Sequence, residues 1–364
     1  MDYILQVFTG GFNQEKLYTS DRIIARLEEI GKDLSFSKVI IGWNNKPGTY
    51  RAVKKYLSSK GIDMILWLPV LSEIGHLEDC KEVVDIYGNK VSSMSFQEGE
   101  DFTFYCPSSE KNFKNVKKVY DELFSDCGFD GVFLDKIRTQ SFVGGTSGVL
   151  SCGCEECRQK YKQKNVSLEE VGRRFKEKGD EFFSTKGYKS GFIFEDELLS
   201  SFFKAKEEII AEEVTELCRY FKGKGLQVGL DLYAPLMSGF VGQNYKLISE
   251  EADFIKPMMY RKTCAPAGIG FEYELLKKSI PGAKGYDEVI TGPEFLSEQL
   301  KEISGLKCKK YPGIEINYLK GVAETDEAYI KESMDVLKKC CMDGAVLAWD
   351  VMNAPSKHIH AAGQ

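Results

Sequence analysis

The feature that most constrains this chain is an alternation of short apolar runs with amphipathic stretches of helical period. The runs are rich in β-branched and aromatic residues, and the segments between them carry apolar residues three and four positions apart. Near-continuous apolar runs separated by helices are typical of parallel strands buried on both faces. The eight runs cover residues 3–9, 38–44, 63–70, 131–137, 227–234, 253–260, 313–319 and 344–352.

Eight such repeats predict a (β/α)8 TIM barrel, formed by residues 1–364 as a single domain. A doubly wound open sheet is the alternative, but "FTGGF" after the first run lacks the GxGxxG spacing of a dinucleotide-binding loop. Two regions exceed a minimal repeat: residues 71–111 extend the loop after the third strand, and residues 139–200 extend the loop after the fourth. Because loops that follow strands build the active site of a barrel, we expect both insertions on the catalytic face.

Composition excludes several classes of function. The net charge is −6 and the basic residues are dispersed, which argues against nucleic acid as a partner. No apolar run approaches the roughly 20 residues of a membrane helix. The odd number of cysteines, 11, and a start without a basic leader region favour a cytoplasmic protein. Only three histidines are present, which argues against a His-rich catalytic metal site, and we expect no organic cofactor.

Acids, amides and aromatic rings gather at the predicted C-terminal ends of the strands, where a barrel carries its catalytic residues. Carbohydrate sites use this mixture, because aromatic faces stack on pyranose rings while carboxylates and amides bind hydroxyl groups. We therefore predict a carbohydrate substrate. The predicted substrate-binding residues are Trp43, Asn44, Trp67, Arg138, Tyr233, Tyr260, Arg261, Asn317, Trp349 and Asp350.

Glycoside hydrolysis normally needs two carboxyl groups, one that protonates the leaving oxygen and one that attacks the anomeric carbon or activates water. Asp135 ends the fourth run, and no helix begins until after the cysteines. Glu315 lies within an apolar run, where an unpaired carboxylate would cost roughly several kcal/mol. We predict Asp135 and Glu315 as the catalytic pair, with Asp231 as a substitute for either. The alternative for each acid is a helix cap, a loop start or a structural ion pair.

The stretch "CGCEEC" places Cys152, Cys154 and Cys157 in a CxCxxC array. A tetrahedral thiolate zinc site needs a fourth ligand, and Cys106 in the preceding long loop can supply it. Four cysteines leave no open coordination position, so the prediction is a closed structural zinc site. The alternative is a set of free thiols in a loop.

The order of Cys106, Asp135 and the CxCxxC array resembles the zinc loop of family 42 β-galactosidases. That family has an Asn–Glu pair at the fourth strand, where this chain has Leu134–Asp135, and its seventh-strand glutamate nucleophile would correspond to Glu315. The pieces "GFDGVFLD", "GQNY" and "DFIKPMMY" also resemble a wider group of uncharacterised glycoside hydrolases of barrel fold. In that group a fourth-strand aspartate can be the nucleophile, so the resemblance leaves the role of Asp135 open.

Two other functions stay open on the sequence. The first is a carbohydrate-binding barrel without turnover. The second is a Schiff-base lyase that uses Lys256, because class I aldolases of barrel fold carry their lysine on the sixth strand. For Lys256 we favour an ion pair with a neighbouring acid inside the barrel, since a buried lysine is costly without one.

Overall fold

The eight predicted runs form a closed parallel barrel in the computed structural model, which describes residues 1–73, 80–91, 95–96 and 100–364. Each strand pairs in parallel with its two neighbours, and β1 closes the ring by pairing with both β2 and β15. The barrel strands are β1 (Asp2–Phe8), β2 (Lys38–Gly42), β3 (Asp63–Pro69), β6 (Gly131–Asp135), β9 (Gln227–Tyr233), β10 (Phe254–Met258), β12 (Gly313–Glu315) and β15 (Gly344–Ala348). The predicted (β/α)8 barrel is therefore confirmed, and the open-sheet alternative is excluded.

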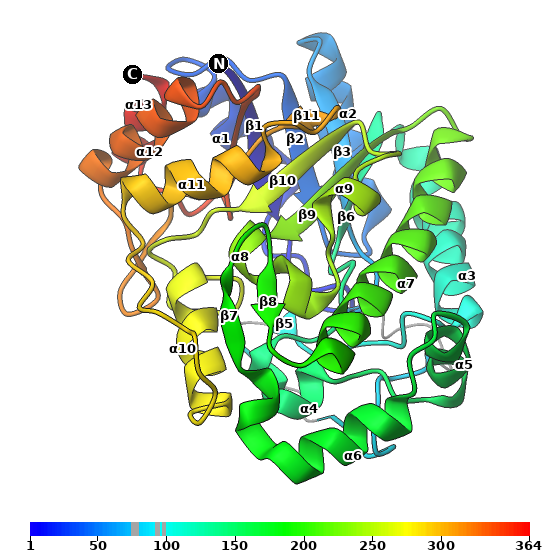
Figure 1. Ribbon diagram of the computed structural model, residues 1–364. Helices are drawn as coiled ribbons and strands as arrows, with labels where there is room; N and C mark the ends of the chain where they lie inside the picture. Colours follow the sequence, from blue (N-terminus) through cyan, green and yellow to red (C-terminus); the bar gives the residue numbers. More distant parts are fainter. Residues whose placement is uncertain (74–79, 92–94, 97–99) are drawn as a thin grey trace.

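Helices surround the strands and cover their outer faces (Figure 1). The amphipathic stretches expected from the sequence form these helices, and α1 buries Ile23, Leu27 and Ile30 at helical spacing. The helices between and after the strands are α1 (Ser20–Ile30), α2 (Pro47–Ser59), α3 (Glu110–Val119), α7 (Glu197–Lys222), α8 (Pro235–Ser238), α9 (Tyr245–Ile248), α10 (Ile269–Ser279), α11 (Pro293–Ile303), α12 (Glu327–Lys339) and α13 (Ser356–Gly363). None of the helices in the described residues combines the length and the apolar character that crossing a membrane requires.

The long segment after β6 folds into elements of its own, which gather in the lower part of Figure 1. It packs against the loop after α10, where the Thr185 amide donates to the Lys284 carbonyl at 2.9 Å. These elements are α4 (Gly145–Val149), α5 (Glu155–Gln163), α6 (Leu168–Lys178), β7 (Thr185–Tyr188) and β8 (Phe192–Phe194). The short strands elsewhere are β4 (Ser95–Phe96), β5 (Glu100–Asp101), β11 (Lys309–Lys310), β13 (Tyr318–Leu319) and β14 (Ala323–Glu324).

Candidate active site

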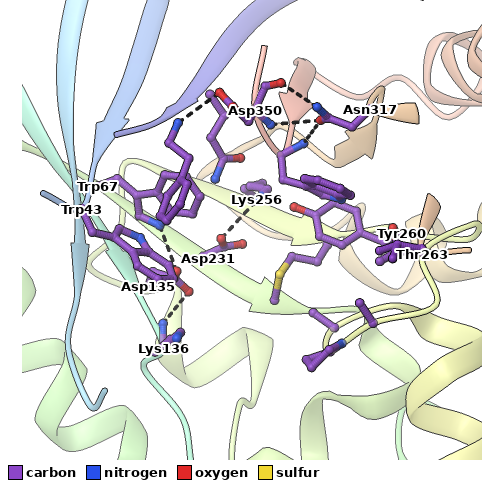
Figure 2. Close-up of a pocket in the computed structure, with 18 of the residues that line it drawn as sticks. Trp43, Trp67, Asp135, Lys136, Asp231, Lys256, Tyr260, Thr263, Asn317 and Asp350 are labelled. Atoms are coloured by element: carbon purple, nitrogen blue, oxygen red, sulfur yellow. Dashed lines mark hydrogen bonds and ion pairs between the residues drawn. The ribbon is translucent and has the colours of Figure 1, made fainter. Parts of the chain in front are cut away.

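A pocket of about 610 Å³ opens at the C-terminal ends of the barrel strands. Its base is polar, and its walls carry aromatic and apolar side chains (Figure 2). The size falls in the range of small-molecule binding sites. The strands and the loops that follow them therefore meet at one cavity, as the fold predicts for a barrel active site.

Asp231 and Lys256 form a buried ion pair at the base of the pocket. Lys256 Nζ donates to Asp231 Oδ2 at 3.0 Å, and both residues line the pocket. The ion pair favoured for Lys256 on the sequence is thus confirmed. The other carboxylate oxygen, Oδ1, is buried and has no protein partner in the described residues. Burial raises the pKa of Asp231 to about 7, although the charge of Lys256 acts in the opposite direction.

Asp135 lies in the same part of the pocket, close enough for its charge to raise the pKa of Asp231 further. One oxygen accepts a hydrogen bond from Trp67 Nε1 at 2.9 Å, and the other accepts from the Lys136 backbone amide at 2.5 Å. The two acids therefore differ in environment: Asp231 is desolvated and keeps one oxygen without a partner among the described residues, whereas both oxygens of Asp135 accept hydrogen bonds.

Aromatic rings form the wall next to Asp135. Trp43 and Trp67 contact each other edge to face with centroids 5.3 Å apart, and Phe8 packs against Trp43 at 5.1 Å. Tyr260 and Trp349 also line the pocket. The indole Nε1 groups of Trp43 and Trp349 are buried without a protein partner in the described residues. They remain free to donate to a ligand, as tyrosine and tryptophan often do at binding sites.

Two cations stand beside the carboxylates. Lys136 Nζ lies 3.2 Å from Glu73 Oε1 and 4.5 Å from the centre of the Trp43 ring. The Arg138 guanidinium lies 4.7 Å from the Phe104 ring and 4.3 Å from the Tyr233 ring. Aromatic contact on both sides fixes the guanidinium at the pocket wall.

Asp350 and Asn317 brace the opposite side of the pocket. Asn317 Oδ1 accepts from the Trp349 and Asp350 amides, and its Nδ2 donates to the Asp350 carbonyl at 2.8 Å. The Asp350 carboxylate accepts from the Phe8 amide, from Tyr18 Oη and from Asn353 Nδ2. Burial raises the pKa of Asp350 to about 6. These donors hold the Asp350 carboxylate in place at the pocket wall.

Glu315 is not among the residues that line the pocket. Its Oε1 accepts from the Lys262 amide at 2.6 Å, and its Oε2 accepts from Tyr329 Oη of α12 at 2.8 Å. Burial raises its pKa to about 7. The structure therefore does not bring Glu315 into the pocket with Asp135, and the partners of its carboxylate account for its presence in an apolar strand.

Three other predicted binding residues also stand outside the pocket lining. Asn44 is buried and donates to the Gln14 carbonyl at 2.7 Å. Tyr233 is buried beneath Arg138 and donates to Glu272 at 2.8 Å. Arg261 forms an ion pair with Glu332 at 2.9 Å. Their polar groups support the loops instead of facing the cavity. The predicted residues that line it are Trp43, Trp67, Asp135, Arg138, Asp231, Tyr260, Asn317, Trp349 and Asp350.

Several lining residues were not predicted as site residues from the sequence. Gln6 lies within the first strand, and Phe102 and Thr263 lie in loops after β3 and β10. The rim is formed by Leu17, Tyr318 and other apolar side chains. The sequence does distinguish Gln6, because it is the one amide in the apolar run "YILQVFT". The loop residues carried no comparable signal.

The four predicted cysteine ligands converge, from the loops after β3 and β6. Cys106 Sγ lies 3.4 Å from Cys154 Sγ and 3.5 Å from Cys157 Sγ. The four sulfur atoms, including that of Cys152, all lie within 4.8 Å of one another. A tetrahedron with zinc–sulfur bonds of about 2.3 Å places its sulfurs about 3.8 Å apart. The predicted convergence is confirmed, and the sulfur atoms fit a four-coordinate metal ion.

No protein-family model matches the chain, and no curated protein matches it in sequence. Solved structures do match it. The glycoside hydrolase domain of PgaB (BpsB) from Bordetella bronchiseptica aligns with a TM-score of 0.63 and 15% identity, over 99% of this chain and 98% of that chain. The β-N-acetylhexosaminidase from Bacteroides fragilis NCTC 9343 gives a TM-score of 0.54 at 9% identity, over 100% of this chain and 66% of that chain.

A class V chitinase from Pseudomonas fluorescens Pf-5 gives a TM-score of 0.51 at 10% identity, over 100% of this chain and 98% of that chain. At such identities the likeness establishes a common fold. The chain therefore shares its (β/α)8 barrel with three structures that are named as glycoside-cleaving proteins.

Proposed function

We propose that this protein is a glycoside hydrolase in which Asp135 and Asp231 perform the chemistry. The observation that carries the proposal is the pairing of two acids with different environments in one aromatic-lined pocket. Glycosidases need one carboxyl group that holds a proton and one that is ionised. The fold shared with glycoside-cleaving proteins supports the same conclusion.

The assignment of roles follows from the environments. Asp231, with a pKa raised to about 7, keeps a proton near neutral pH and has one free oxygen toward the pocket. It donates that proton to the glycosidic oxygen as the bond to the leaving group breaks. Asp135, whose oxygens accept from Trp67 Nε1 and the Lys136 amide, either forms the new bond to the anomeric carbon itself, to be displaced by water, or takes the proton of the water molecule that forms it. Trp43, Trp67, Tyr260 and Trp349 offer faces for the sugar ring.

The lyase alternative is weaker. A Schiff base forms at an amine that is free to attack a carbonyl group, whereas Lys256 Nζ is fully buried and already bonded to Asp231 Oδ2 at 3.0 Å. The non-catalytic barrel remains the competing function, because a sugar pocket by itself does not require turnover.

The test is hydrolysis of a panel of 4-nitrophenyl α- and β-glycosides and of oligosaccharides by wild type, Asp135→Asn and Asp231→Asn. We expect release of sugar by wild type and its loss in both variants. Asp253→Asn is the matched control, because Asp253 accepts from the Val228 amide at the opposite end of the barrel. Binding of a panel sugar without hydrolysis would favour the non-catalytic barrel.

We also propose that Cys106, Cys152, Cys154 and Cys157 hold a structural zinc ion. All four positions of a tetrahedron are filled by thiolates, so the ion would have no open position for substrate. Its role is to join the loop after β3, which contains Cys106, to the loop after β6. None of the 11 cysteines, all of which lie in the described residues, forms a disulfide, which supports a reducing compartment, and we propose the cytoplasm.

A further inference from the structure

Gln6 is a polar side chain at the base of the pocket, in the middle of an otherwise apolar strand. Its neighbours Ile4, Leu5 and Val7 are fully buried, and Gln6 is 0% exposed as well. It pairs with Ile40 of β2 in the barrel sheet and lines the pocket. Its amide therefore lies inside the barrel mouth, out of contact with bulk solvent.

Neither side-chain amide atom of Gln6 has a protein partner in the described part of the chain. Both Nε2 and Oε1 are buried and unbonded within the described residues. Two other buried amides of this fold are bonded: Gln299 Oε1 accepts from the Leu236 amide at 2.7 Å, and Asn317 is bonded at both of its atoms. A buried unpaired amide lowers the stability of a fold, so this position is costly for the folded protein by itself. A ligand in the pocket that hydrogen-bonds to the Gln6 side chain would offset this loss of stability.

The chemistry of the free atoms restricts the ligand. Gln6 presents a donor and an acceptor side by side, and the free Trp43 Nε1 adds a donor to the same pocket. A carboxylate or a fully ionised phosphate only accepts hydrogen bonds, so it would leave Gln6 Oε1 unpaired. An apolar group would leave the amide unpaired. Two adjacent hydroxyl groups match it, because one can donate to Oε1 while the oxygen of the other accepts from Nε2.

We propose that Gln6 is a substrate-binding residue that recognises a pair of neighbouring hydroxyl groups on the sugar ring held between the catalytic acids. The inference rests on the proposed function in one respect, namely that a carbohydrate occupies this pocket. It goes beyond that function by naming the feature of the carbohydrate that is recognised at the base of the pocket, a pair of neighbouring hydroxyl groups.

The first test is the stability of the sugar-free protein. Gln6→Met has nearly the same shape and removes the unpaired amide, so its melting temperature should equal or exceed that of wild type. Gln299→Met is the matched control: it leaves the Leu236 amide unpaired and should melt at a lower temperature. A fall in melting temperature for Gln6→Met as large as that for Gln299→Met would assign Gln6 a structural role and overturn the inference.

The second test is binding, measured by calorimetry in the Asp135→Asn background so that turnover does not interfere. The probes are 4-nitrophenyl glycosides, and the tightest binder is then compared with its 2-, 3-, 4- and 6-deoxy analogues. Adding Gln6→Met should weaken binding about 10- to 100-fold, as expected for two lost hydrogen bonds in a buried site. For two of the deoxy analogues, which lack neighbouring hydroxyl groups, the affinity should be the same with and without Gln6→Met. For the remaining analogues, Gln6→Met should still weaken binding.

The outcomes separate this inference from the proposed function. Binding that depends on Gln6, without hydrolysis by wild type, rejects the hydrolase and keeps the inference. Hydrolysis by wild type together with unchanged affinity in Gln6→Met rejects the inference and keeps the hydrolase. The inference is also overturned if the effect of Gln6→Met depends on an acetamido substituent of the probe instead of on two hydroxyl groups. Failure of every probe to bind overturns it as well.

Discussion

Lys256 Nζ donates to only one oxygen of Asp231, at 3.0 Å, and the second oxygen has no protein partner in the part of the chain that the structure describes. This half-satisfied pair distinguishes Asp231 from Asp135, Asp350 and Glu315, whose two oxygens each accept a hydrogen bond. An acid that is buried, partly neutralised and open toward a cavity is suited to proton transfer.

Asp135→Asn and Asp231→Asn should each lower kcat/KM by about 10³-fold or more, because each removes one of the two roles that glycoside hydrolysis requires. Circular dichroism and melting curves should show that both variants remain folded. The Asp231 variant should recover activity on glycosides with a good leaving group such as 2,4-dinitrophenol, which needs no proton. Equal losses on good and poor leaving groups would contradict the assignment of Asp231 as the acid.

The pH dependence of kcat/KM should fall on the alkaline side near the raised pKa of Asp231, about 7, because the proton donor is lost as pH rises through that value. Lys256 lowers this pKa, so Lys256→Met should move the alkaline limb to higher pH. Lys54→Met removes a comparable partner, from Asp130, and serves as the control. A limb that stays in place in Lys256→Met would show that another group titrates.

Glu315→Gln should keep most of the activity and change the pH dependence of stability. Burial raises the pKa of Glu315 from 4.5, its ordinary value, to about 7 in the folded protein. Between these two pH values the folded protein keeps a proton on Glu315 that the unfolded chain has released. Stability of wild type should therefore fall as pH rises from about 4.5 to 7.

Glu315→Gln has no carboxyl group to titrate at this position, so its free energy of unfolding should not fall in this way. The difference in free energy of unfolding, Glu315→Gln minus wild type, should therefore be roughly 1–3 kcal/mol larger above pH 7 than at pH 4. Urea unfolding at both pH values measures the difference. Glu298→Gln, on an exposed position of α11, is the control and should change little. A turnover loss in Glu315→Gln as large as that in Asp135→Asn would restore Glu315 to the catalytic pair.

Cys154→Ser should lower the melting temperature and the zinc content measured by mass spectrometry of the metal, while kcat falls less than in the aspartate variants. The reason is that a closed thiolate site contributes to folding and not to the reaction. Cys264→Ser is the matched control, since Cys264 is exposed and outside the cluster. Equal metal content and equal melting temperatures in the two variants would rule out the structural metal.

The barrel could be predicted because its signal is local and repeated. Each apolar run became a strand, but the strands are shorter than the runs at their C-terminal ends: the run over residues 313–319 yields β12, which ends at Glu315. The last residues of a run leave the sheet to build the pocket, and hydrophobic pattern alone does not mark where pairing stops.

The site could be predicted only in part. Asp135 and Asp231, which line the pocket, were predicted as site residues because a carboxylate near the end of a buried strand is conspicuous. Glu315 met the same criterion, yet Tyr329 and the Lys262 amide bind it, and neither partner is visible from its position in the sequence. Gln6 was not predicted, because a prediction based on carboxylates does not include an amide within an apolar run. Side-chain direction and long-range partners decide such cases, and both depend on the tertiary fold.

The four-cysteine cluster joins positions that are up to 51 residues apart along the chain, counted from Cys106 to Cys157. Phe102 lies shortly before the first of these cysteines, Arg138 lies between the first and the others, and both line the pocket. Convergence of the four sulfur atoms restricts the conformations of the two segments that carry these side chains. A ligand of the pocket would therefore meet a wall that is already partly ordered, and less entropy would be lost on binding.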